Sequence, residues 1–352
     1  MELNFKENKY NEKALTIKLE EKSIHSPEEA FFLLINGYDY ESLDNLCTFI
    51  SRYYYLDEEE SYQLTQDLNL DKENKKIIMN LAKDCIKLGM SLGNKLVCNG
   101  KFEATSWISH CMYVGEVCET LANAQGLNKD IALTLGLLHD YGRRIDQSFK
   151  HVIVGFQELT DLGWNNEALS CLTHSFLNGG RCANNEPAEG GFYVDDEGNP
   201  QWEFGTKKDD ITTFLENYQY TEYDTILNIA DLMATSNGIV SPYERIEDIA
   251  TRRIIDPTNR GYFLAELTNT LIDFLKRTNH LKEDFPYIKA TKATTLKEIE
   301  MSFKVVSLCF YNTYLEISTD NKKIFSLEPQ KKEENTPHII KKLRQSNKEN
   351  KI

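Results

Sequence analysis

The residues of this chain that could do chemistry are histidines and aspartates gathered in its central third. The adjacent pair His139 and Asp140 ends the apolar run in LGLLHD. Packing alone does not explain why such a run ends with two polar residues. Imidazoles and carboxylates that converge on one point bind divalent metal ions. The pattern therefore predicts a metal centre, and its candidate ligands in chain order are His110, His139, Asp140, His151, His174 and Asp231.

The surroundings of these residues support the same interpretation. Asp231 interrupts the apolar stretch ILNIADLMA, where an unpaired charge would be expensive. His139 and Asp140 point about 100° apart on an ideal helix, so they can share one cleft only where a helix ends, just before Gly142. Taken alone, His110 could equally be a buried core residue or a metal ligand. Its order along the chain with the other candidates favours a ligand.

Cationic side chains follow the His139-Asp140 pair at once. Arg143 and Arg144 lie one turn beyond it, and Lys150 precedes His151. Guanidinium groups bind phosphate in a bidentate manner and a lysine ammonium attracts it as a point charge, so we expect these three residues, Lys150 less than the arginines, to contact a phosphorylated substrate. A salt bridge within the helix is the favoured alternative for the more distant Arg245 and Arg252.

The ordered set resembles the HD superfamily of metal-dependent phosphohydrolases, over roughly residues 100–255. The resemblance implies that His110, His139, Asp140 and Asp231 hold one metal ion. In the subgroup with two additional histidines, it further implies that Asp140 bridges to a second ion held by His151 and His174. The interval from Asp140 to His151 is short for such a ligand, so a role for His151 in facing the substrate stays open.

The resemblance predicts hydrolysis of a phosphoester or phosphoanhydride by a metal-activated water, with Asp140, Arg143, Arg144 and Lys150 as catalytic residues. The cofactors would be two divalent ions, either iron, manganese or another first-row metal, with magnesium also allowed. A nucleotide-type small molecule is the expected substrate. The Gly-Tyr-Pro signature of the HD-type cyclic dinucleotide phosphodiesterases is missing.

Two other functions remain open. A diiron oxygenase of the HD type, similar to the myo-inositol oxygenases, would use a similar ligand set to activate dioxygen. A regulatory module could instead use the fold to sense a nucleotide, although a module that only binds has no need of six metal ligands.

Composition limits the class of protein and its partners. Hydrophobic residues make up 41% and charged residues 27% of the 352 residues, as in ordinary globular proteins. Residues 321–352 hold nine Lys and Arg against four Glu, so they contribute +5 to the net charge of −15 and leave −20 on the remainder. So acidic a body disfavours nucleic acid as a partner.

Targeting signals and disulfides are not expected. No stretch approaches the roughly 20 uncharged apolar residues of a membrane span, and the first residues are too charged for a signal peptide. The eight scattered cysteines are typical of a reduced protein, and we read Cys111, Cys118 and Cys171 as core residues. We therefore expect a cytoplasmic protein without a membrane partner.

The elements that must position these residues are almost all helical, so the predicted fold class is all-α, an HD-domain helical bundle with additional helices on both sides. We divide the chain into a helical N-terminal extension or cap (1–99), a catalytic domain (100–255), C-terminal helices that pack on the core (256–320) and a charged, disordered tail (321–352). The catalytic domain carries a long loop insertion at 178–210, which we expect to border the site. The N-terminal helices could contact an oligomer or protein partner.

Overall fold

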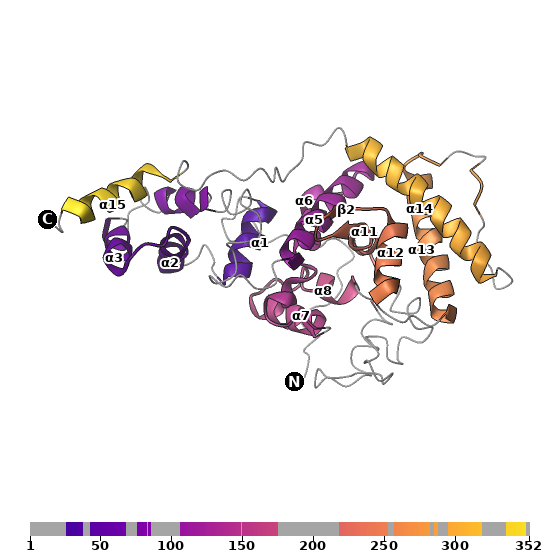
Figure 1. Ribbon diagram of the computed structural model, residues 1–352, viewed down its shortest axis with the longest axis horizontal. Coiled ribbons are helices and arrows are strands. Elements are labelled where there is room, and N and C mark those ends of the chain that lie inside the picture. Colours follow the sequence, from indigo (N-terminus) through magenta and orange to yellow (C-terminus); the bar gives the residue numbers. More distant parts are fainter. Residues whose placement is uncertain are drawn as a thin grey trace. The chain divides into compact units, whose positions relative to one another are not determined.

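The computed structural model describes residues 26–37, 43–67, 76–82, 84–85, 106–148, 150–174, 218–252, 257–281, 285–287, 295–318 and 336–349. The chain divides into two compact units. One unit comprises 1–17 and 107–324, and the other comprises 18–106 and 325–352. Apart from turns and loops, the described residues form helices and one small hairpin, which confirms the all-α prediction (Figure 1). None of the described helices combines the length and apolar composition that a membrane-spanning segment requires.

The larger unit is built around a hydrophobic core that several helices share. Helix α5 carries His110, α6 leads to the His139-Asp140 pair, and α11 packs against α6. Its elements are α5 (Ser106–Ala124), α6 (Lys129–Leu138), the 3-10 helix η2 (Tyr141–Arg144), α7 (His151–Asp161), α8 (Leu169–Thr173), α11 (Glu222–Asp231), β1 (Ala234–Thr235), β2 (Gly238–Ile239), α12 (Pro242–Arg252), α13 (Pro257–Arg277) and α14 (Leu296–Ser318).

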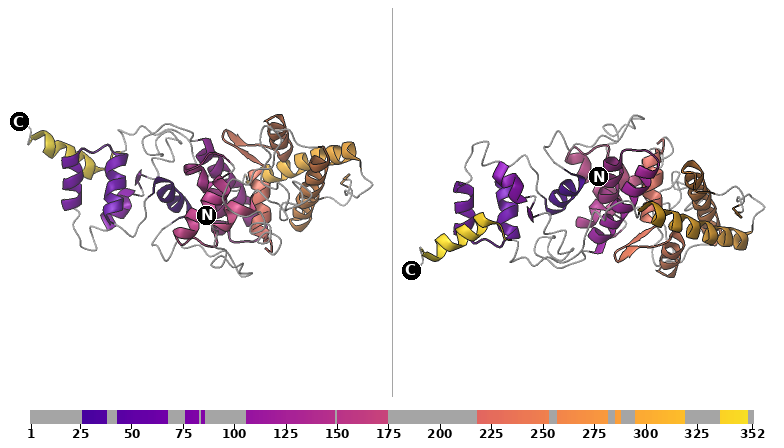
Figure 2. Two further views of the ribbon diagram at one scale, coloured as in Figure 1. Left: turned by 90° about the horizontal axis from the view of Figure 1, so that it is seen from below. Right: turned by 90° about the horizontal axis from the view of Figure 1, so that it is seen from above.

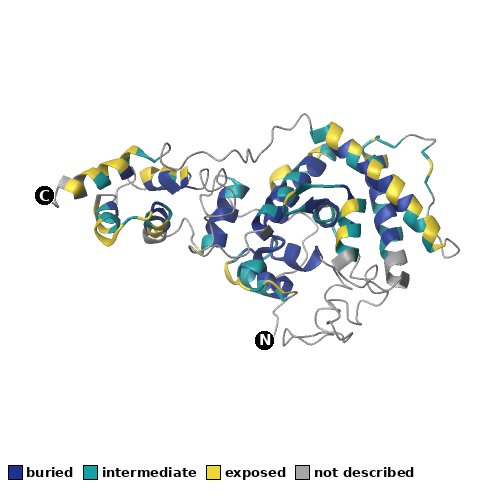
Figure 3. Ribbon diagram, in the orientation of Figure 1, coloured by how far each residue is buried: buried dark blue, intermediate teal, exposed yellow. Residues whose placement is uncertain are grey.

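Burial follows the helix faces that meet in this core. Residues of α5, α6, α11, α13 and α14 form a single buried cluster that includes Val117, Leu135, Leu227, Leu271 and Phe310. Figure 3 shows α5, α6 and α11 mostly in the colour of buried residues, whereas α14 carries exposed residues along one side. The long helices α13 and α14 pack against each other, as the views in Figure 2 also show. Helices α5, α6 and α11, which carry or precede candidate ligands, are therefore part of this core.

Local sequence signals explain where two of these helices begin. The side chain of Asn128 caps α6 by accepting hydrogen bonds from the backbone N–H groups of Asp130 and Ile131. Thr221 and Asp224 form a reciprocal capping box at the start of α11. Both caps satisfy backbone donors that have no partner within a helix.

The end of α11 differs from the prediction. The apolar periodicity predicts a helix over Glu222–Ser236, but α11 ends at Asp231, and the next residues form the antiparallel hairpin β1–β2. The Thr235 hydroxyl donates to the Gly238 carbonyl and accepts from the Asn237 N–H, which stabilises a tight turn. Gly238 has φ 151°, a conformation open to glycine. Asp231 is consequently the last residue of its helix and not a mid-helix residue.

The smaller unit contains α1 (Pro27–Asn36), α2 (Leu43–Tyr53), α3 (Glu58–Asp67) and α15 (His338–Glu349), together with helical residues in 76–85. As the sequence indicates, Ser26 caps α1 and Gly37 ends it at φ 75°. For residues 338–349 the prediction of a disordered tail is wrong, because α15 packs on α3 and buries Ile340 and Leu343. Arg344 also donates a hydrogen bond to the Tyr54 carbonyl.

Candidate metal centre

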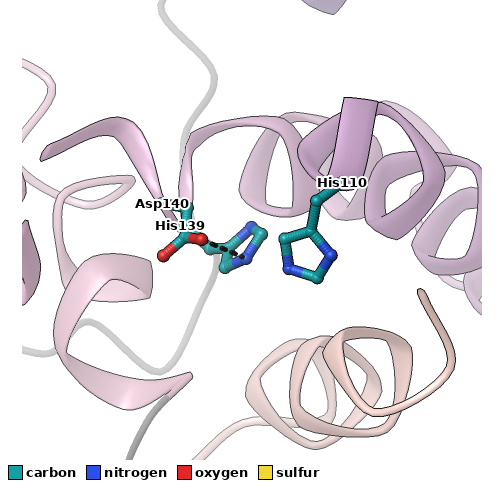
Figure 4. A group of neighbouring side chains, drawn as sticks. All are labelled: His110, His139 and Asp140. Atoms are coloured by element: carbon teal, nitrogen blue, oxygen red, sulfur yellow. Dashed lines mark ion pairs between the residues drawn. The ribbon is translucent and has the colours of Figure 1, made fainter. Parts of the chain in front are cut away.

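The six candidate ligands lie at the ends of four helices and within a fifth. His110 belongs to α5, whereas His139 and Asp140 follow directly after α6. The remaining three are His151, the first residue of α7, His174, which caps α8, and Asp231, which ends α11. Figure 4 shows the imidazoles of His110 and His139 facing each other, with Asp140 beside His139. Because His139 and Asp140 lie at the end of a helix, both can face one cleft, as the sequence predicts.

Two groups of ligand atoms share Asp140. His110, His139 and Asp140 offer ligand atoms that lie within 4.8 Å of one another, and so do Asp140, His151 and His174. The two carboxylate oxygens face different groups. Oδ2 of Asp140 lies 3.8 Å from His139 Nε2, whereas Oδ1 lies 2.9 Å from His151 Nε2 and 3.7 Å from His174 Nε2. We call these the first group and the second group.

Asp231 belongs beside the first group. Its Oδ1 lies 2.9 Å from Nε2 of His110 and 3.9 Å from Nε2 of His139. The exposed fraction is 24% for its side chain and 10% for that of His110, against 3% for His151 and 4% for His174. The first group is therefore the one nearer to solvent.

Backbone carbonyls fix the direction of three imidazoles. Nδ1 of His139 lies 2.7 Å from the Gly136 carbonyl, and Nδ1 of His174 lies 2.9 Å from the Ser170 carbonyl. His151 makes the same kind of contact with the carbonyl three residues before it. A carbonyl only accepts, so Nδ1 must carry the proton and Nε2 keeps its lone pair toward the centre. This is the usual arrangement around metal-binding histidines.

The pKa values of His139, His174, Asp140 and Asp231 suit the binding of a cation. Burial, together with the neighbouring His139, lowers the pKa of His174 to about 3. Burial likewise lowers the pKa of His139. For the two carboxyls burial acts in the opposite direction, but the surrounding imidazoles outweigh it and the pKa values of Asp140 and Asp231 lie well below their usual range. Neutral imidazoles and ionised carboxylates are the forms that ligate metals.

The donor set fits divalent metal ions. Nε2 of His139 is buried and has no hydrogen-bond partner among the described residues. A buried polar atom of this kind is costly unless something ligates it. Four imidazoles and two carboxylates suit first-row divalent ions, and a carboxylate whose two oxygens face separate groups suits a pair of them.

The three cationic candidates have different surroundings. Nε of Arg143 lies 2.5 Å from Oδ2 of Asp140, so this guanidinium is part of the centre. Arg144 instead pairs with Glu158 at 3.3 Å and lies over the ring of Tyr141.

Lys150 stands next to a ligand in sequence, directly before His151 and α7. Its charge helps to lower the pKa of Asp146, after a larger contribution from hydrogen bonds to Ser148. Arg143 is a cation for which the structure shows a contact with a candidate ligand.

The cysteines near the centre are structural, as predicted. Cys111, Cys118 and Cys171 are buried, and burial raises the pKa of each thiol. The ion pair of Arg245 with Asp248 likewise matches the expected salt bridge. The 178–210 loop lies outside the described residues.

Residues that hold the ligands in place were missed by sequence reasoning. Gly142 lies so close to the start of α7 that a Cβ there would meet the His151 carbonyl oxygen at 2.0 Å. Thr173 donates a hydrogen bond to Asp224, which joins α8 to α11. A helical glycine and the T-x-x-D capping pattern at Thr221 are visible in the sequence, but neither reveals which partner it meets.

Comparison with known proteins supports the same assignment for the central part of the chain. Residues 107–234 match the family model described as HD domain. No curated protein and no solved structure matched the chain. The matched segment spans all six candidate ligands, from His110 to Asp231. The chain thus carries a segment similar to the HD domain, a superfamily whose members are generally metal-dependent phosphohydrolases.

Proposed function

We propose that this chain is a phosphohydrolase with a dinuclear metal centre, acting on a phosphoester or phosphoanhydride of the nucleotide type. The observation that carries the proposal is the position of Asp140, whose two oxygens face two separate groups of imidazoles. When bound, two divalent ions activate a water as nucleophile and neutralise charge on the phosphate. No serine or cysteine nucleophile is then needed.

Each ligand group would hold one ion. His110, His139, Asp140 and Asp231 would hold the first, and His151 and His174 would hold the second together with Asp140. The contacts of Nδ1 with backbone carbonyls support these roles, because they leave Nε2 directed into the centre. The 2.9 Å between His151 and Asp140 favours a ligand over a residue that only faces the substrate.

Arg143 would act beside Oδ2 of Asp140, the oxygen that faces the first ligand group. Its guanidinium orients the carboxylate through Oδ2 and places a cation next to the centre, where a phosphate would carry negative charge. The exposed fraction of its side chain, 27%, leaves the group accessible. For Arg144, whose guanidinium pairs with Glu158, we expect a smaller contribution than for Arg143, and Lys150 stays a prediction as a phosphate contact.

The side of the centre nearer to solvent indicates how the substrate enters. Because Asp231 and His110 are more exposed than His151 and His174, the phosphate would approach the first group. The strong negative charge of the chain favours a substrate that is small and metal-bound over a long polyanion.

The test combines metal content with turnover. Protein purified without oxygen is assayed for metal per chain and for cleavage of bis-p-nitrophenyl phosphate and a panel of nucleotides. We expect about two ions per chain and cleavage that Asp140→Ala abolishes. Asp130→Asn is the matched control, because Asp130 is exposed at the other end of α6. Bound iron with oxygen consumption and no cleavage would point to the oxygenase, and no metal at all would leave the sensing module.

A further inference from the structure

A buried network of polar side chains lies directly behind the second ligand group. Thr173 precedes His174, is fully buried, and donates from Oγ1 to Oδ1 of Asp224 at 2.8 Å. Asn228 Nδ2 donates to the Thr173 carbonyl at 3.1 Å and to the Asp224 carbonyl at 2.8 Å. The end of α8 is therefore bound to α11 through both its side chain and its backbone. We call Thr173, Asp224 and Asn228 the α8–α11 latch.

Asp224 makes more hydrogen bonds than a helix cap requires. Its Oδ2 accepts from the Thr221 N–H at 2.8 Å, the Thr221 hydroxyl at 2.7 Å and the Tyr218 hydroxyl at 3.0 Å. Burial raises the pKa of this carboxyl in spite of these hydrogen bonds. A capping box works equally well at an exposed helix start. The burial of Asp224 and its additional hydrogen bond from Thr173 instead connect the start of α11 to α8.

Helix α8 depends on such support. It has only five residues, far fewer than the roughly 12–15 that an isolated helix needs for marginal stability. The same short helix supplies the Ser170 carbonyl that orients His174 through Nδ1. A displacement of α8 would move His174 Nε2 away from Asp140. Such a shift would weaken metal binding, because metal–ligand distances tolerate a change of only about 0.2 Å.

The latch also reaches the first ligand group. Asn228 lies three residues before Asp231 on α11, so the two residues share one side of that helix. Helix α11 thus both contacts the end of α8 and carries Asp231, a candidate ligand of the first group. Thr173 and Asn228 join the positions of His174 and Asp231.

We infer that Thr173, Asp224 and Asn228 are positioning residues that set His174 for the second metal ion and tie its place to that of Asp231. This inference rests on the proposed dinuclear function. It predicts that loss of the Thr173 hydroxyl weakens the second ion selectively, while the first group keeps its ligands and their contacts.

The test is a Mn²⁺ titration of the full chain in which electron paramagnetic resonance counts free and bound ions. Thr173→Val removes the hydroxyl at nearly constant volume. We expect one ion to bind as in the wild type and the other to bind about 10–100-fold more weakly, with loss of the signal of the coupled Mn²⁺ pair. Thr173→Ser keeps a hydroxyl and should restore most of the affinity.

A matched control separates positioning from general destabilisation. Thr268 is a buried threonine on α13 whose hydroxyl donates to the Leu264 carbonyl. Thr268→Val should leave both Mn²⁺ affinities unchanged, and thermal unfolding of both variants is measured in parallel. If Thr173→Val bound both ions as tightly as the wild type, the latch would be overturned and the proposed function would stand. Equal losses of affinity in Thr173→Val and Thr268→Val would lead to the same conclusion. Only one ion bound by the wild type would overturn the dinuclear function and the latch together.

Discussion

Gly115 of α5 and Gly136 of α6 lie in direct backbone contact. A Cβ built on Gly136 would stand 2.7 Å from the Cα of Gly115. This close approach brings α5, which carries His110, against α6, which leads to His139. The ring centroids of the two histidines lie 5.2 Å apart. The first ligand group therefore depends on two residues without side chains.

Substitution of Gly136 should be more harmful than substitution of Gly115. A Cβ at Gly136 meets backbone atoms, which cannot move independently, so we expect Gly136→Ala to cost about 1–3 kcal/mol of unfolding free energy. A Cβ at Gly115 meets the ends of the Leu133 and Leu137 side chains, which can change rotamer. Denaturant unfolding of both variants measures the difference. Equal stability of the two would contradict the backbone contact.

The two adjacent arginines should behave differently. Arg143 holds the carboxylate of Asp140, so we expect Arg143→Ala to lower turnover or metal affinity about 10–100-fold. Arg144→Ala removes a partly exposed ion pair with Glu158, worth less than about 1 kcal/mol, and should leave turnover close to the wild type. Steady-state kinetics with bis-p-nitrophenyl phosphate compares them. A larger loss in Arg144→Ala would assign phosphate binding to Arg144 instead.

Metal ions should stabilise the fold through the centre. Ligands from α5, α7, α8 and α11 come together only in the folded chain, so a metal at about 100 times its Kd should add about 2.7 kcal/mol to the unfolding free energy. Differential scanning calorimetry with Mn²⁺ and with a chelator measures the gain. Asp140→Ala should abolish the response, whereas His338→Ala, an exposed residue on α15, should keep it. A response that survives Asp140→Ala would place the metal elsewhere.

Helix α15 should stabilise the smaller unit. Leu343 is buried where α15 packs on α3, so we expect Leu343→Ala to cost about 2–5 kcal/mol, as for other buried leucines. Hydrogen exchange should show faster exchange in α2 and α3 with little change in α5 and α6. Lys341→Ala is the exposed control on the same helix. Unchanged exchange in α3 would mean that α15 contributes no stability.

Several features of the fold could be predicted because they depend on neighbours in sequence. Hydrophobic periodicity indicated α5 and α6, and capping residues marked the start and end of α1, since a helix is decided by contacts three or four residues apart. The same local logic failed at Ser236, because the turn at Gly238 reverses the chain before the apolar pattern ends. It failed at residues 338–349, because the packing of α15 on α3 depends on residues about 280 positions away.

The sequence by itself determined which residue types are available for the chemistry proposed at the candidate site. Residue types and their order predict six candidate ligands, since imidazoles and carboxylates bind metals wherever the fold brings them together. Only the tertiary structure decided how these ligands group around Asp140, that Arg143 and not Arg144 meets its carboxylate, and that Thr173 joins α8 to α11. These relationships are distances between side chains on different helices, and close packing of the core sets such distances, which no spacing along the chain encodes.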